Sequence, residues 1–121
     1  GFKKSEFLYG LNIAKQYIMN SRSAFLVEGQ GDVWRMHEAG IKNTVGIFGA
    51  SLSEDQLVLL EKSGAMKLYI ATDSDDAGQK AASQIAKRGG RRFNYQRINI
   101  SEKDVGDMTI EQIKNEILSQ L

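Results

Sequence analysis

The sequence of 121 residues contains no cysteine and no proline, and His37 is its single histidine. The absence of cysteine excludes disulfides, cysteine-ligated zinc, iron–sulfur clusters and a thiol nucleophile. A single imidazole likewise excludes any site that needs two. Any bound metal ion must therefore be held by oxygen ligands, which favour Mg²⁺ or Mn²⁺ over zinc.

The sequence also lacks a long apolar run. No stretch approaches the ~20 residues that cross a bilayer, and the N-terminus does not resemble a signal peptide. With a net charge of +1 and 41% hydrophobic residues, we expect one folded cytoplasmic domain and no membrane partner. The chain begins with Gly1 rather than Met, so we expect a piece of a longer protein; a naturally short, stand-alone protein is the alternative.

Hydrophobic periodicity predicts an α/β fold. A helix with one buried stripe is expected over residues 5–20, followed by strands over 24–27, 44–48, 67–71 and 92–98. Helices are expected over 32–39, 53–63, 77–88 and 109–120. This alternation favours a Rossmann-like, mostly parallel sheet of about four strands flanked by helices, with the last strand at an edge and an extra helix in front.

Acidic residues follow the predicted strands. Glu28 ends the first strand, Asp73 and Asp75 follow the third, and Asp104 with Asp107 follows the fourth. In an open parallel sheet the carboxyl ends of the strands form the site, so these carboxylates are expected to meet there. Their mutual repulsion would be relieved by Mg²⁺ or Mn²⁺. The alternative is that such loop carboxylates cap helices, a role that is favoured for Asp76.

Four segments, in this order and at this spacing, resemble the Toprim domain of DnaG-type primases, topoisomerases and some nucleases: Leu26-Val27-Glu28-Gly29-x-x-Asp32-Val33, Ile47-Phe48-Gly49-Ala50-Ser51-Leu52-Ser53, Asp73-x-Asp75-x-Ala77-Gly78 and Lys103-Asp104-x-x-Asp107-Met108. The preceding segments are similar to the stretch before this domain in bacterial and phage DnaG-type primases: Phe2-Lys3-Lys4 and Leu8-Tyr9-Gly10-Leu11-x-x-Ala14-Lys15. The resemblance implies that residues 1–22 are the tail of the primase basic subdomain and residues 23–121 a Toprim catalytic domain.

The resemblance also implies a metal-dependent nucleotidyl transferase. Such a domain would synthesise RNA primers from ribonucleoside triphosphates on single-stranded DNA during replication, with a replicative helicase as partner through regions that this sequence does not contain. Glu28, Asp73 and Asp75 would be catalytic and would bind Mg²⁺ or Mn²⁺, with Asp104 as a further ligand. The supporting acidic residues would be Asp32, Asp76 and Asp107.

Basic and small residues complete the expected site. A basic surface that holds template phosphates would include Lys3, Lys4, Lys15 and Arg22; the alternative is the solvated face of an amphipathic helix. Gly49 and Ser51 follow the second strand and are expected near a nucleotide phosphate. On the helix over 32–39, Trp34 and Met36 are expected to pack inward.

Two other functions remain open. The first is a Toprim nuclease that cleaves phosphodiesters with the same carboxylates, which would leave Tyr9-Gly10-Leu11 unexplained. The second is a non-catalytic Toprim scaffold in recombination or repair, which the joint presence of Glu28, Asp73 and Asp75 argues against. Because the sequence has no cysteine, the zinc module of primases is not part of it, and we expect this piece alone to synthesise little or no primer.

Overall fold

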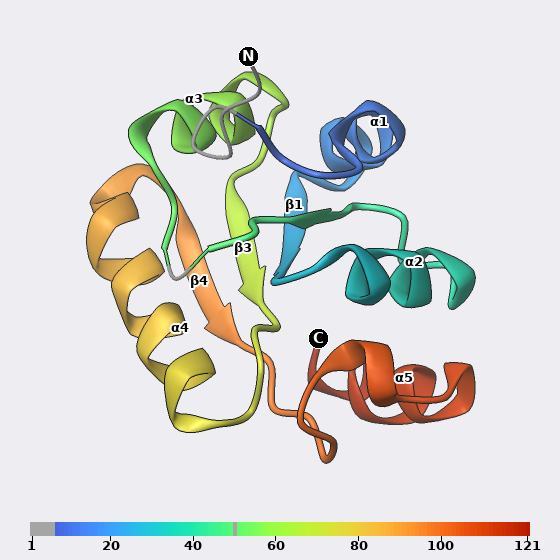
Figure 1. Cartoon of the computed structure of the whole chain (residues 1–121). Coiled ribbons are helices and arrows are strands. Elements are labelled where there is room, and N and C mark those ends of the chain that lie inside the picture. The colour runs from blue at the N-terminus through green and yellow to red at the C-terminus, as the bar shows by residue number, and fades with distance from the viewer. Residues whose placement is uncertain (1–6, 50) are drawn as a thin grey trace.

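The structure is a computed structural model that describes residues 7–49 and 51–121. Helices and strands alternate along the chain (Figure 1). The elements are α1 (Leu11–Ser21), β1 (Ser23–Val27), α2 (Gln30–Glu38), β2 (Thr44–Gly46), α3 (Glu54–Lys62), β3 (Lys67–Ile70), α4 (Asp76–Gly89), β4 (Asn94–Arg97) and α5 (Ile110–Glu116), with 3₁₀ helices η2 (Gly90–Arg92), η3 (Val105–Asp107) and η4 (Leu118–Gln120).

The four strands form one parallel sheet in the order β2-β1-β3-β4. In the central strand, Leu26 lies opposite Val45 of β2 and Ile70 of β3. The predicted α/β architecture is confirmed, and so is the position of β4 at an edge. Since all strands run in the same direction, their carboxyl ends lie at one edge of the sheet.

Helices cover both faces of the sheet, and β1 contributes side chains to each side. Ala24 and Leu26 pack in a core with α1, α3 and α4, whereas Phe25 and Val27 pack in a second core with α2 and α5. Figure 1 shows α4 and α5 on opposite sides of the strands. No helix within the described residues is long and apolar enough to cross a membrane.

The first helix begins later than the sequence predicted. Its N-cap, Gly10, has a φ of 81°, a left-handed conformation that suits glycine. Just before it, Tyr9 pairs antiparallel with Gly46, each backbone N–H donating to the other residue's carbonyl oxygen at 2.9 and 3.0 Å. The prediction of helix from residue 5 was therefore wrong for residues 7–10, because this segment adds to the sheet edge. Residues 5 and 6 lie outside the described part.

Trp34 of α2 does not pack inward as the sequence predicted. Val33 and Met36 are fully buried, and Met36 was expected to be. Trp34 is 54% exposed, and its indole N–H donates to the Tyr9 hydroxyl at 2.8 Å. Trp34 is adjacent to Val33 on the helix, so it cannot share the stripe formed by Val33 and Met36.

A glycine lets α4 approach the loop after β3. A Cβ at Gly78 would overlap the carbonyl oxygen of Asp73. The contact is reinforced by Thr72, which is fully buried and whose hydroxyl donates to the carbonyl oxygen of Gly78 at 2.8 Å. The first turn of α4 thus packs directly against the backbone that carries Asp73.

We predict that Gly78→Ala destabilises the fold by at least about 2 kcal/mol, because the added methyl forces loop and helix apart. Urea unfolding would measure this loss. Gly31→Ala is the matched control, since it lies in α2 and a Cβ there meets nothing within 4 Å; it should be neutral or stabilising. Equal stability of the two variants would contradict the packing argument.

Candidate active site

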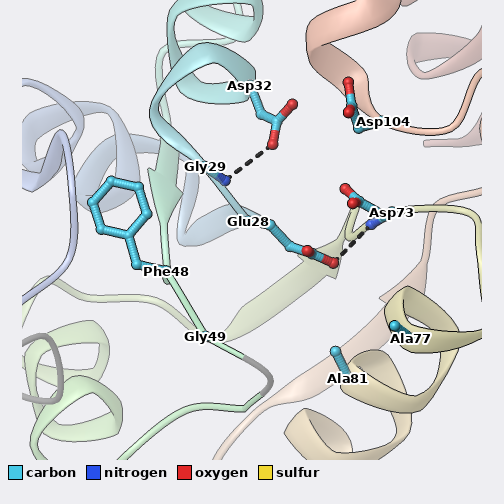
Figure 2. Close-up of a pocket in the computed structure, with 9 residues that line it drawn as sticks. All are labelled: Glu28, Gly29, Asp32, Phe48, Gly49, Asp73, Ala77, Ala81 and Asp104. Atoms are coloured by element: carbon cyan, nitrogen blue, oxygen red, sulfur yellow. Dashed lines mark hydrogen bonds between the residues drawn. The ribbon is translucent and has the colours of Figure 1, made fainter.

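A pocket of about 480 Å³ lies at the carboxyl ends of the strands. Figure 2 shows the residues that line it: Glu28, Gly29, Asp32, Phe48, Gly49, Asp73, Ala77, Ala81 and Asp104. Four of them are carboxylates, and each comes from a different segment. Glu28 follows β1, Asp32 lies in α2, Asp73 follows β3, and Asp104 precedes η3. The sheet therefore gathers acidic side chains that are up to 76 positions apart in the sequence (28 to 104).

Glu28 and Asp73 are joined directly. The backbone N–H of Asp73 donates to Oε1 of Glu28 at 3.0 Å, and Figure 2 shows the Glu28 side chain reaching across to Asp73. Both residues are half-buried. A carboxylate that accepts a backbone hydrogen bond is fixed in place, so Glu28 connects the end of β1 to the loop between β3 and α4.

The pocket holds more negative charge than its described residues neutralise. The pKa of Asp73 is raised from 3.8 to about 7, first by burial and then by repulsion from Glu28, Asp32, Asp104 and Asp75. An acid with such a pKa is protonated in about half of the molecules at neutral pH. The pocket therefore favours the uptake of a proton or of another cation.

Asp32 links α2 to the segment after β4. Its Oδ2 accepts from the Gly29 N–H at 3.0 Å, and its Oδ1 accepts from the Gly106 N–H at 2.7 Å. Burial raises the pKa of Asp32, while these two hydrogen bonds act in the opposite direction. Asp104 caps η3 by accepting from the Asp107 N–H at 2.9 Å, and Asp107 itself is exposed.

Asp75 and Asp76 do not line the pocket. Asp75 is the N-cap of α4, where its Oδ1 accepts from the Gly78 N–H at 2.8 Å. Asp76 is the first residue of the helix and is exposed. The structure thus gives the capping role to Asp75, whereas the sequence favoured Asp76 for it.

Sequence reasoning missed Arg97, the last residue of β4. Its guanidinium is half-buried and donates to the carbonyl oxygens of Ile70, Thr72 and Asp73 at 2.9 to 3.0 Å. Burial lowers the pKa of Arg97, whereas Glu28 and Asp73 raise it. The available signal was an arginine at the carboxyl end of the last strand, the same position that identified the acidic residues.

Comparison with known proteins agrees with this geometry, since residues 22–101 match the Toprim domain. The chain belongs to the Toprim domain family. It is 48% identical over 80 residues to the DNA primase of Aquifex aeolicus (66% of this chain, 16% of that protein) and 39% identical over 84 residues to that of Chlamydia pneumoniae (69% and 14%). The chain thus spans less than a fifth of these relatives.

Two solved primases have a similar fold. The crystal structure of the zinc-binding and RNA polymerase domains of Aquifex aeolicus primase matches 98% of this chain and 30% of its own, with 35% identity and a TM-score of 0.78. The RNA polymerase domain of Mycobacterium tuberculosis primase DnaG, in complex with a double-stranded DNA oligomer with a 6-nucleotide overhang, matches 97% and 40%, with 25% identity and a TM-score of 0.80. The predicted family resemblance is confirmed.

The carboxylates of this Toprim pocket fit a hard divalent cation by their chemistry. Oxygen donors suit Mg²⁺ or Mn²⁺, and the raised pKa of Asp73 marks a place where positive charge is favoured. Within the described residues, however, no three such side chains are gathered closely enough to hold one ion as they stand. Binding of one ion would require these carboxylates to come closer together than they are here.

The two predicted basic residues that the structure describes, Lys15 and Arg22, do not line the Toprim pocket. Lys15 is exposed on α1, and Arg22 precedes β1, at the opposite end of the sheet from the carboxylates. Lys3 and Lys4 lie outside the described residues. Of the two small residues, Gly49 lines the pocket; Ser51 does not, and its buried hydroxyl has no hydrogen-bond partner within the part of the chain that the structure describes.

Asp73 should make the stability of the domain depend on pH. Its raised pKa means that between about pH 4 and pH 7 the folded state binds more protons than the unfolded chain, so stability falls as pH rises through this range. We predict that Asp73→Asn is more stable than the wild type at pH 8 in EDTA, and that the difference shrinks toward pH 4. Urea unfolding across this range would measure it.

Asp76→Asn is the control for this experiment, because Asp76 is exposed at the start of α4, directly after the same loop. It should be as stable as the wild type or slightly less stable, since it loses a charge at the helix N-terminus. If Asp73→Asn is no more stable than Asp76→Asn at pH 8, burial and repulsion of the Asp73 carboxylate do not lower the stability of the fold.

The cap at Asp75 gives a separate prediction. Asp75→Ala should lower the free energy of unfolding by about 1 kcal/mol, because the Gly78 N–H loses its acceptor. Asp75→Ser should retain most of the stability, since serine also caps helices. Thermal unfolding followed by circular dichroism tests both; equal losses in the two variants would mean that the charge matters rather than the cap.

Proposed function

We propose that this chain is the metal-dependent catalytic domain of a DNA primase, which joins ribonucleoside triphosphates into RNA primers on a single-stranded DNA template. The observation that carries the proposal is the carboxylate pocket at the carboxyl ends of a Toprim sheet. The similarity of the chain to two DNA primases supports the proposal. We propose further that residues 1–22 belong to a preceding basic subdomain, and that the whole protein acts in the cytoplasm with a replicative helicase.

The proposed site would hold Mg²⁺ or Mn²⁺ with the catalytic residues Glu28, Asp73 and Asp75, and with Asp104 as a further ligand. When bound, such an ion supplies charge neutralisation at the triphosphate and activation of the attacking hydroxyl. Glu28 fixes the backbone of Asp73 through its hydrogen bond. Asp32 holds the loop that carries Asp104 by accepting from the Gly106 N–H, and Asp76 and Asp107 add negative charge outside the pocket.

Template contacts are proposed for the basic residues Lys3, Lys4, Lys15 and Arg22, and phosphate contacts of the nucleotide for Gly49 and Ser51. Support for nucleic acid comes from the Mycobacterium tuberculosis structure, which was solved with DNA. For Gly49 it comes from its position in the pocket wall. Because phosphate binding by lysine and arginine releases counterions, the affinity for the template should fall steeply with salt.

The first test is a titration of this domain with Mg²⁺ and Mn²⁺, followed by nuclear magnetic resonance. We predict saturable shifts with Mg²⁺ and broadening with Mn²⁺ at residues 28, 73–76 and 104. Glu28→Gln and Asp73→Asn should each lower the affinity for the metal ion at least tenfold, because each removes a charged ligand. Asp76→Asn should change the affinity little. A wild-type domain without a localised response would contradict the metal site.

The second test distinguishes the reactions that such a site can support, in the full-length protein that contains this domain. Labelled ribonucleoside triphosphates with unlabelled single-stranded DNA should give template-dependent RNA, which Glu28→Gln should abolish. Shortening of labelled DNA without RNA synthesis would indicate a nuclease instead. Metal binding without either reaction would indicate a scaffold.

A further inference from the structure

Arg97 does not line the carboxylate pocket, but it holds the backbone of Asp73, which does. It lies at the end of the edge strand β4, and its guanidinium turns over the loop that leaves β3. One nitrogen, Nη1, donates to the carbonyl oxygens of Ile70 at 3.0 Å and Thr72 at 2.9 Å. The other, Nη2, donates to the carbonyl oxygen of Asp73 at 2.9 Å. The guanidinium thus contacts the backbone of this loop from the last residue of β3 to Asp73 in the pocket.

The same side chain also contacts α4. Its Nε donates to Oε1 of Gln79 at 3.1 Å, so four of the five guanidinium N–H groups are used. The strand end, the loop and the first turns of the helix are therefore joined through one planar group. A lysine could not reproduce this, because its ammonium is a single point without the rigid fork.

The contacts indicate positioning rather than charge neutralisation. Arg97 faces the negative charges of Glu28 and Asp73, yet within residues 7–49 and 51–121 it has no ion pair; the ion pairs there are those of Arg92 with Glu54 and Glu61. If its purpose were to neutralise the pocket, direct contact with a carboxylate would be expected. Its hydrogen bonds go instead to the carbonyl groups that set the course of the loop.

We propose that Arg97 is a positioning residue that fixes the backbone of Asp73 from behind, so that the Asp73 carboxylate can bind a divalent cation. This inference rests on the metal site of the proposed function. The guanidinium then acts on cation binding in two opposite ways. Its hydrogen bonds order the loop and strengthen binding, whereas its positive charge repels the cation and weakens binding.

Two substitutions separate these effects. Arg97→Lys keeps the charge and loses the fork, and Arg97→Met loses both. If Arg97 positions Asp73, Arg97→Lys should lower the affinity for Mn²⁺ by about tenfold, as is usual when the support of a metal ligand is removed. Arg97→Met should also bind more weakly than the wild type, but less weakly than Arg97→Lys, because it no longer repels the cation. Calorimetry of the domain with Mn²⁺ measures all three.

A second measurement needs no metal. Hydrogen exchange of the Ser74 N–H, which donates to the carbonyl oxygen of Lys103 at 2.7 Å, should speed up in both Arg97 variants, while exchange in β1 stays unchanged. Gln79→Ala is the matched control, since it removes only the contact to α4 and should change affinity much less. If Arg97→Met does not fold, the Mn²⁺ affinity and the Ser74 exchange rate of Arg97→Lys still test the proposal.

Three outcomes would overturn the proposal. Unchanged affinity with Arg97→Lys together with tighter binding by Arg97→Met would show that only the charge matters. Unchanged affinity in both variants would show that the fork does not position Asp73. A wild-type domain that binds no Mn²⁺ would overturn the metal site of the proposed function and this inference with it, whereas the first two outcomes leave that site intact.

Discussion

The arrangement of this domain depends on holding several carboxylates close together against their mutual repulsion. The pKa of Asp73 is raised first by burial of its carboxyl group and then by repulsion from the other carboxylates. Backbone N–H groups offset part of the cost, at Glu28 from Asp73 and at Asp32 from Gly29 and Gly106. Hydrogen bonds to charged acceptors stabilise by about 1.5–3 kcal/mol each, enough to hold the side chains but not to neutralise the pocket.

The overall fold was predictable because it follows from local patterns. Alternating strands and helices of ordinary length leave few topologies apart from a parallel sheet, and carboxylates that follow such strands must lie at one edge. Glu28, Asp73 and Asp104 therefore line the pocket as expected. The beginning of α1 was not predictable in this way, because Tyr9 pairs with Gly46, 37 positions further along the chain (46 − 9).

The details of the site were predictable only in part, because a polar side chain near the pocket can form hydrogen bonds with the backbone instead of facing the pocket. Asp73 and Asp75 both follow the third strand and were therefore expected to meet at the same site. At Asp75 the chain enters α4, and the free N–H groups of the helix attract its carboxylate away from the pocket. Arg97 was missed for a related reason, because its partners are carbonyl groups of another strand's loop, and no sequence pattern records them.

The match to the Toprim family ends at residue 101, but the pocket does not. Asp104 lines it, and the Gly106 N–H donates to Asp32. The segment after residue 101 is anchored independently by Val105, Met108 and Ile113, which are buried in the core on the α2 face. Displacing this segment would remove the carboxylate of Asp104 and leave Asp32 with only its hydrogen bond from the Gly29 N–H. The C-terminal helix is therefore part of the site's architecture, because it holds in place the loop that completes the acidic pocket.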